Sequence, residues 1–216
     1  MSKKIEIIPA INANDFEEIR RRVKLVEPFV EWVQIDAADG TFTKNTIWHN
    51  PEDLAFLETP LKIELHLMLD KMEKRIEDWL LPNVHRIVFH INAANDPDFV
   101  IEKCHEAGKE AGIAVGPNES LVKALEHKEK ADMFQILDVY PGLSGAEIVK
   151  NAFERIGELR EFCENCIIEV DGGMNKETAP KAVEAGANII AVASAIFNAE
   201  NIGEAIKNLQ EAVQKK

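Results

Sequence analysis

Short β-rich runs alternate with amphipathic helical runs along the whole chain, and this alternation is the feature that most constrains the fold. The starts of successive β-rich runs are about 20 to 34 residues apart, which is the length of one strand-plus-helix unit. We predict eight strands, at residues 5–8, 32–35, 61–67, 86–90, 113–115, 133–137, 167–170 and 189–192. No Pro/Gly/Ser-rich linker interrupts them, so we predict a single domain over residues 1–216 with a parallel sheet.

Two architectures fit this alternation: a doubly wound open sheet and a closed (β/α)8 or TIM barrel. An open sheet would usually carry a glycine-rich turn after the first strand, but the chain has Ile8-Pro9-Ala10-Ile11-Asn12 there. Eight units at this length favour a small barrel of eight parallel strands. The active site of such a barrel lies at the carboxyl ends of its strands.

Polar side chains are expected at the carboxyl ends of four strands. Gln34 and Asp36 end the second strand and share a face because they are two residues apart. His66, His90 and Asp171 end the third, fourth and seventh strands. Such groups cost free energy on an apolar strand unless they are paired or functional. The two aspartates and two histidines therefore indicate acid/base chemistry, a divalent metal, or both, the alternative being a rim that is polar because it meets water.

The last two strands carry a second signal. Gly172-Gly173 follows the seventh strand, and Ala193 precedes a short helical segment that starts at Ser194. Loops at these places, with a short helix N-terminus, form the usual phosphate site of this barrel type. The segment after the sixth strand offers further backbone N–H groups. We therefore predict phosphate contacts at Gly142, Ser144, Gly172, Gly173, Ala193 and Ser194.

The charge balance argues against polyanionic partners. The chain has 25 Lys and Arg against 38 Asp and Glu, a formal net charge of −13. A surface this acidic repels nucleic acid and anionic lipid, although a local group of backbone N–H donors can still bind a small anion. No apolar run approaches the roughly 20 residues that span a bilayer. The N-terminus lacks the apolar run of a signal peptide, so we expect a cytoplasmic protein.

Three cysteines, an odd and low count, fit a reducing compartment. Cys163 and Cys166 form a C-x-x-C, which is either a redox or metal pair or simply two half-buried thiols between a helix and a strand. We favour the two thiols, because there is no second C-x-x-C and no thioredoxin-like context.

Five segments, in order and at the expected spacing, resemble the ribulose-phosphate 3-epimerase family. They are residues 36–42 (DAADGTF), 66–68 (HLM), 141–142 (PG), 169–175 (EVDGGMN) and 193–197 (ASAIF). The resemblance runs from residue 8 to about residue 197, and residues 169–175 are its most specific part.

The resemblance implies the interconversion of D-ribulose 5-phosphate and D-xylulose 5-phosphate by metal-assisted proton transfer at C3. Asp36 and Asp171 match the acid/base pair, which must act on opposite faces of a planar intermediate. Asp36, His66 and Asp171 match metal ligands, and Gln34 stands at the position of the family's first metal ligand. His66 and Met68 match substrate-lining residues. We thus expect one divalent ion (Zn, Mn, Fe or Mg), a sugar-phosphate substrate and a homo-oligomer.

Several site positions depart from the family pattern. Gln34 stands where the family has a histidine ligand, and an amide oxygen binds zinc or iron more weakly than imidazole does. The other departures are Ala10 for serine, Ala38 and Leu137 for methionine, Tyr140 for asparagine and Ala193 for glycine. We therefore expect weak metal binding or none. The alternative function is a diverged phosphosugar-binding barrel with another isomerase activity or no activity. A phosphosugar decarboxylase or aldolase is disfavoured, because residues 36–39 hold no lysine beside the aspartates.

Overall fold

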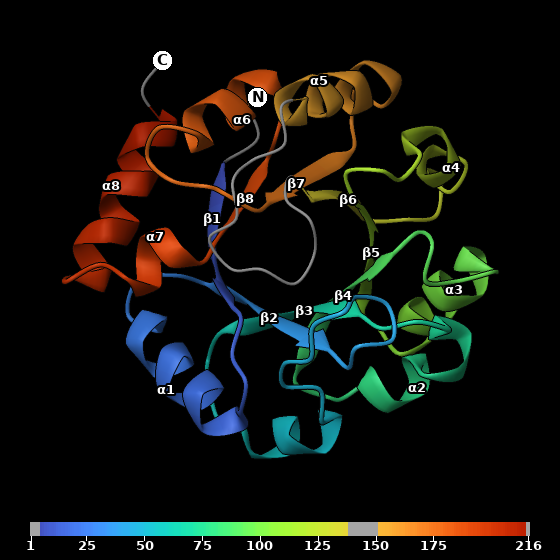
Figure 1. Ribbon diagram of the computed structural model, residues 1–216, viewed down its shortest axis with the longest axis horizontal. Helices are drawn as coiled ribbons and strands as arrows, with labels where there is room; N and C mark the ends of the chain where they lie inside the picture. Colours follow the sequence, from blue (N-terminus) through green and yellow to red (C-terminus); the bar gives the residue numbers. More distant parts are fainter. Residues whose placement is uncertain (1–4, 138–150, 215–216) are drawn as a thin grey trace.

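A closed barrel of eight parallel strands forms the centre of the molecule (Figure 1). The computed structural model describes residues 5–137 and 151–214. The strands are β1 (Glu6–Ile11), β2 (Trp32–Ala38), β3 (Lys62–Met68), β4 (Val84–His90), β5 (Glu110–Val115), β6 (Met133–Leu137), β7 (Ile167–Asp171) and β8 (Ile189–Val192). Each strand pairs with the next, and β1 pairs with β8. The predicted (β/α)8 barrel is confirmed, and the open sheet is wrong because β8 closes onto β1.

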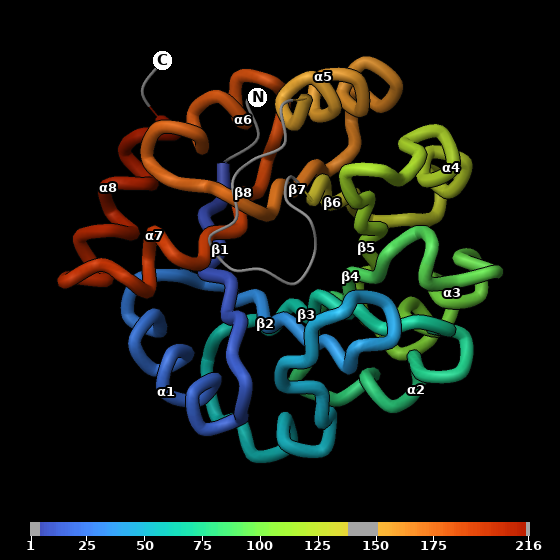
Figure 2. Tube along the Cα trace, in the orientation of Figure 1, coloured from blue at the N-terminus to red at the C-terminus, as the bar shows by residue number. Residues whose placement is uncertain are grey.

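Helices surround the barrel on its outer side (Figure 2). They are α1 (Phe16–Val26), η1 (Pro51–Phe56), η2 (Met72–Lys74), α2 (Ile76–Trp79), α3 (Pro97–Glu106), α4 (Leu121–Leu125), α5 (Ala152–Phe162), α6 (Ala179–Ala185), α7 (Ser194–Phe197) and α8 (Ile202–Gln214), where η marks a 3₁₀ helix. In α1 the buried residues Ile19, Val23 and Val26 form one apolar stripe, and the Asp15 side chain caps the helix by accepting from the Glu18 N–H. No helix in the described ranges is long and apolar enough to span a membrane.

Strand β1 is longer than the sequence indicated. We expected it to end at Ile8, but it continues to Ile11 because Ala10 and Ile11 pair with Gln34 and Ile35 of β2. A proline at position 9 does not stop the strand, since β1 pairs Pro9 with Val192 and the neighbouring residues complete the ladder. Pairing with β2 therefore sets the carboxyl end of this strand.

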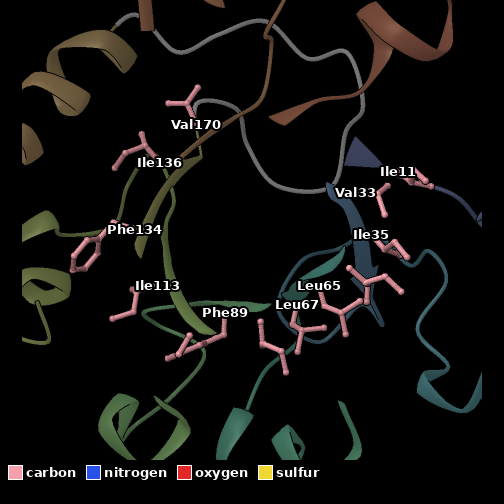
Figure 3. Close-up of a cluster of buried hydrophobic side chains, with 14 of the residues drawn as sticks. Ile11, Val33, Ile35, Leu65, Leu67, Phe89, Ile113, Phe134, Ile136 and Val170 are labelled. Atoms are coloured by element: carbon pink, nitrogen blue, oxygen red, sulfur yellow. The ribbon is translucent and has the colours of Figure 1, made fainter. Parts of the chain in front are cut away.

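The main hydrophobic core lies between the strands and the helices. Figure 3 shows side chains of this core around the barrel wall, including Ile35, Leu65, Phe89 and Phe134. All four are completely buried. They alternate along their strands with the residues that fill the barrel, as the two-residue period of a strand requires.

The interior of the barrel is layered. Ile8, Trp32 and Ile189 form an apolar cluster near the amino ends of their strands. Further along the strands lies a buried polar layer, the polar floor, which consists of Gln34, Glu64, Arg86, Gln135 and Glu169. The next inward-facing residues toward the carboxyl ends are Asp36, His66 and Asp171. The predicted rim residues thus rest on the polar floor.

The C-x-x-C lies in the turn between α5 and β7, and its two cysteines form a disulfide. We had favoured two free thiols, and the structure corrects this. The turn brings the Cα atoms of Cys163 and Cys166 to 5.5 Å, within the range of disulfides. Arg160 holds the turn by donating to the carbonyl oxygens of both cysteines, at 3.1 and 2.8 Å.

Candidate active site

Asp36, His66 and Asp171 come together at the carboxyl ends of β2, β3 and β7. Asp36 and His66 are register partners on neighbouring strands, while Asp171 is the last residue of β7. One ligand atom of each residue lies within 4.8 Å of the others. His66 is almost completely enclosed, and the carboxylates keep slight access to solvent. The geometry therefore assembles a site from segments far apart in the sequence.

Gln34 bridges the two aspartates. Its side-chain Nε2 donates to Asp36 Oδ1 at 2.8 Å and to Asp171 Oδ2 at 2.9 Å. Its Oε1 accepts from Gln135 Nε2 at 3.1 Å. In this orientation Gln34 presents N–H groups, and not its oxygen, to the aspartates.

His66 lies against the same two carboxylates. Its Nδ1 is 3.3 Å from Asp36 Oδ1 and 3.5 Å from Asp171 Oδ2. Burial lowers the pKa of His66, but the hydrogen bonds to Asp171 and Asp36 outweigh burial and raise the pKa to about 10. The imidazole thus carries a positive charge between two negative groups.

His90 and Glu119 extend this cluster away from the aspartates. His90 Nε2 lies 3.1 Å from His66 Nε2, and His90 Nδ1 lies 3.4 Å from Glu119 Oε2. Burial lowers the pKa of His90. The sequence placed His90 at the rim but did not indicate Glu119, which follows β5 and is held by the Gly116 N–H at 2.6 Å. No local pattern marks Glu119, because only the fold brings it to His90.

The polar floor pairs its polar groups in part. Arg86 pairs with Glu64 at 2.7 Å, and its guanidinium stacks 4.3 Å from the ring centroid of Trp32. Gln135 Nε2 donates to Glu169 Oε1 at 2.7 Å. Burial raises the pKa of both Glu64 and Glu169, with the neighbouring Glu64 charge acting on Glu169 as well. The sequence signal for both glutamates was their two-residue spacing from His66 and Asp171.

An apolar cluster lies beside the rim. Met68, which ends β3, packs with Ala38 and Ile47. Phe42 joins the cluster, and its ring centroid is 4.4 Å from that of His90. Met68 is thus next to the site, and its contact with substrate stays a prediction.

Asp39 holds the loop after β2. Its carboxylate accepts from the Thr41 N–H and hydroxyl, and pairs with Arg75. Burial raises the pKa of Asp39, but these partners outweigh it and leave the pKa below its usual value.

The predicted anion-binding segments follow neighbouring strands. Gly172 and Gly173 follow β7 with φ of +106° and +65°, a region that favours glycine. Ala193 and Ser194 follow β8, which pairs with β7, and Ser194 begins α7. The predicted contacts at Gly142 and Ser144, together with Tyr140, lie outside the described residues.

The donor set fits a divalent ion in part. Asp36, His66 and Asp171 supply two carboxylate oxygens and one imidazole nitrogen, a combination that binds divalent metals. Gln34 points its amide nitrogen, whose lone pair is delocalised and not available to a metal, at the same place. The three residues can hold a metal, whereas Gln34 would have to turn its amide to become a ligand.

A comparison with models of known protein families shows which family this chain belongs to. The model of the ribulose-phosphate 3 epimerase family matches residues 6–197. The chain belongs to the ribulose-phosphate 3-epimerase family. The resemblance seen in the sequence is thereby confirmed, and the family match covers every candidate residue named above.

Curated epimerases align with nearly the whole chain. Ribulose-phosphate 3-epimerase of Synechocystis sp. is 32% identical, covering 98% of this chain and 96% of the relative. The chloroplastic ribulose-5-phosphate-3-epimerase of Arabidopsis thaliana is 30% identical, covering 95% and 76%. The Bacillus subtilis ribulose-phosphate 3-epimerase is 28% identical, covering 95% and 98%.

Solved structures share the fold at lower identity. KGPDC from Streptococcus mutans superposes with a TM-score of 0.76 at 9% identity, covering 97% of both chains. Thiamine phosphate pyrophosphorylase from Pyrococcus furiosus gives 0.65 at 21% identity, covering 98% of this chain and 95% of the other. These likenesses support the barrel and say nothing further about activity.

Proposed function

We propose that this family member is an active epimerase that interconverts D-ribulose 5-phosphate and D-xylulose 5-phosphate. The observation that carries the proposal is the meeting of Asp36 and Asp171 at one rim, on strands from opposite halves of the chain. Inversion at a carbon requires one group on each face of a planar intermediate, and two separately positioned carboxylates meet this requirement. Asp36 and Asp171 are thus the proposed acid/base pair.

The neighbouring residues keep the two carboxylates in place. Gln34 and His66 each contact both aspartates, so the position of one carboxylate is linked to that of the other. A divalent ion held by Asp36, His66 and Asp171 would supply positive charge that stabilises an enediolate. The carboxylate-rich set favours Mn²⁺ or Mg²⁺ by ligand type, although zinc generally binds more tightly than either.

Recognition of the substrate phosphate is proposed for the loops after β6, β7 and β8. Backbone N–H groups near Gly173 and Ser194 would bind the phosphate, as anions bind at such turns and helix starts. The proposed contacts at Gly142 and Ser144 complete this set. Met68 would line the apolar side of the sugar.

The second candidate function is a phosphosugar-binding barrel with a different isomerase activity or none. Gln34 at the expected histidine position favours it, because the amide now occupies the place where a ligand is expected. The two candidates differ in one measurable event, the exchange of the C3 proton.

Incubation with D-ribulose 5-phosphate in deuterated water tests the proposal. We expect deuterium to enter C3 while D-xylulose 5-phosphate forms, both followed by proton NMR. Asp36→Asn and Asp171→Asn should each abolish exchange, whereas Asp78→Asn on the exposed face of α2 should leave it unchanged. Binding of the sugar phosphate without exchange in the unsubstituted protein would favour the second candidate. Normal turnover in either site variant would contradict the two-aspartate mechanism.

The homo-oligomeric state and the cytoplasmic location stay expectations from the sequence.

A further inference from the structure

Two buried amides lie in series beneath the aspartates. Gln34 and Gln135 are both inaccessible to solvent. Gln135 Nε2 donates to Gln34 Oε1 and to Glu169 Oε1, and Gln34 Nε2 donates to Asp36 and Asp171. The series of donors therefore runs from Gln135 through Gln34 to the aspartates.

The orientation of Gln34 is fixed from both sides. If Gln34 alone turned, its Oε1 would stand about 2.8 to 2.9 Å from two carboxylate oxygens, where only acceptors face each other. Its Nε2 would at the same time face Nε2 of Gln135, where only donors meet. Gln34 therefore cannot turn unless a cation lies between the aspartates and Gln135 turns too.

The side-chain oxygen of Gln135 could accept a hydrogen bond from Gln34 if both amides turned. Its Oε1 is buried and has no hydrogen-bond partner among residues 5–137 and 151–214. A buried acceptor without a partner is unfavourable and needs an explanation. After both amides turn, Gln135 Oε1 would accept from Gln34 Nε2. Gln135 would give up its 2.7 Å hydrogen bond to Glu169, and Glu169 Oε1 would have to move away from the turned amide oxygen, because both atoms are acceptors.

We propose that Gln34 and Gln135 form an amide switch that controls divalent metal binding. In the metal-free state, Gln34 joins the two aspartates through its N–H groups. In the metal-bound state both amides are turned, so that Gln34 offers Oε1 to the ion. This amide switch lies in the site of the proposed epimerase, and it rests on the proposed function only in taking that site as the active site. Gln135 is in this view a positioning residue, because it acts through Gln34.

The switch makes metal affinity depend on a residue that is not a ligand. Gln135→Met keeps the side-chain length but removes the hydrogen bonds that hold Gln34 in the metal-free orientation. Its affinity for Mn²⁺ should rise by roughly two- to tenfold, which corresponds to the net value of one hydrogen bond. A merely structural role for Gln135 predicts unchanged or weaker binding.

Titration of chelator-stripped protein with Mn²⁺, with free Mn²⁺ measured by EPR, tests the proposal. The variants are Gln135→Met, Gln34→His as a reference with a restored imidazole ligand, and Gln210→Met on α8 as a matched control. We expect Gln34→His to bind most tightly, Gln135→Met to be intermediate, and Gln210→Met to equal the parent protein. Circular dichroism reports whether each variant is folded. Folded Gln135→Met that binds Mn²⁺ no better than the parent would overturn the switch.

A second measurement uses the parent protein and does not depend on any variant being stable. The side-chain amide signals of Gln34 and Gln135 should both shift in nitrogen-15 NMR spectra when Zn²⁺ is added, because both groups change partners. Signals that stay in place at saturating Zn²⁺ would also overturn the switch. Neither readout uses catalysis, so an absence of epimerase activity would contradict the proposed function and leave the switch standing.

Discussion

His66 and His90 face each other inside the barrel, with their Nε2 atoms 3.1 Å apart. One of these nitrogens must donate and the other accept. Since burial lowers the pKa of His90 and its Nδ1 faces Glu119, a neutral His90 with its proton on Nδ1 accepts from His66 Nε2–H. The pair thereby turns Nδ1 of His66 toward the aspartates.

Removal of His90 should disturb the orientation of His66. His90→Leu should lower kcat/KM by roughly tenfold or more, the usual effect of losing a partner that orients a site residue. His90→Gln, whose Oε1 can accept the same proton, should recover part of the loss. Steady-state kinetics at constant metal concentration provides the measurement. Equal activity of His90→Leu and the parent protein would show that the contact has no positioning role.

The charge on His66 should make the metal-free protein less stable in alkali. Its folded pKa of about 10 is above the unfolded value near 6.5. The corresponding stabilisation is therefore complete below about pH 6.5 and is lost as the pH rises to about 10. Urea unfolding in chelator at about pH 7 and about pH 9.5 should show this loss in the parent and a smaller one in His66→Gln. Equal losses in both proteins would contradict the assignment.

Loss of Arg86 should strongly destabilise the barrel. The Arg86–Glu64 pair is buried, and removal of one partner leaves an uncompensated charge at a cost of about 3 to 5 kcal/mol. Urea unfolding of Arg86→Met should show this decrease in the free energy of unfolding. Arg21→Met, which breaks an exposed pair with Glu18 on α1, should change the free energy of unfolding far less. The double variant Glu64→Leu/Arg86→Met should recover stability relative to Arg86→Met alone.

The three cysteines should react differently with a thiol reagent. Burial raises the pKa of Cys104 to about 12, so its thiol stays protonated and enclosed at about pH 8. Native protein with the Cys163–Cys166 disulfide should react with no equivalents of Ellman's reagent, and reduced native protein with two. Denaturant should expose the third thiol. Three reactive thiols in reduced, folded protein would contradict the burial of Cys104.

Ala193→Gly should improve binding of the sugar phosphate. The proposed phosphate contacts lie around Gly173 and Ser194, and a methyl group at position 193 would narrow the approach to the adjacent backbone. We expect a lower KM with kcat little changed, and a higher KM for Ala193→Val. Ala195→Gly, in the short helix α7 that Ala193 precedes, controls for added backbone freedom. If neither substitution at position 193 changes KM, the phosphate binds elsewhere.

The barrel and most of its rim could be predicted from local properties of the amino-acid sequence. The two-residue period of the strands and their regular spacing placed Asp36, His66 and Asp171 on one face without any long-range contact. The similarity of residues 169–175 to the epimerase pattern then indicated the family. The metal and phosphate roles of these residues remain predictions, including those at Gly142 and Ser144.

Contacts between distant parts of the chain decide which atoms of the site lie against each other. Gln34 was expected as a metal ligand, but its amide N–H groups face Asp36 and Asp171 because Gln135, 101 residues further along the chain, donates to its oxygen. Glu119 likewise contacts His90, 29 residues before it in the chain, only because the fold brings the two residues together. A periodic pattern fixes the face on which a side chain lies. The direction of a hydrogen bond depends on partners that only barrel closure and strand register bring within reach.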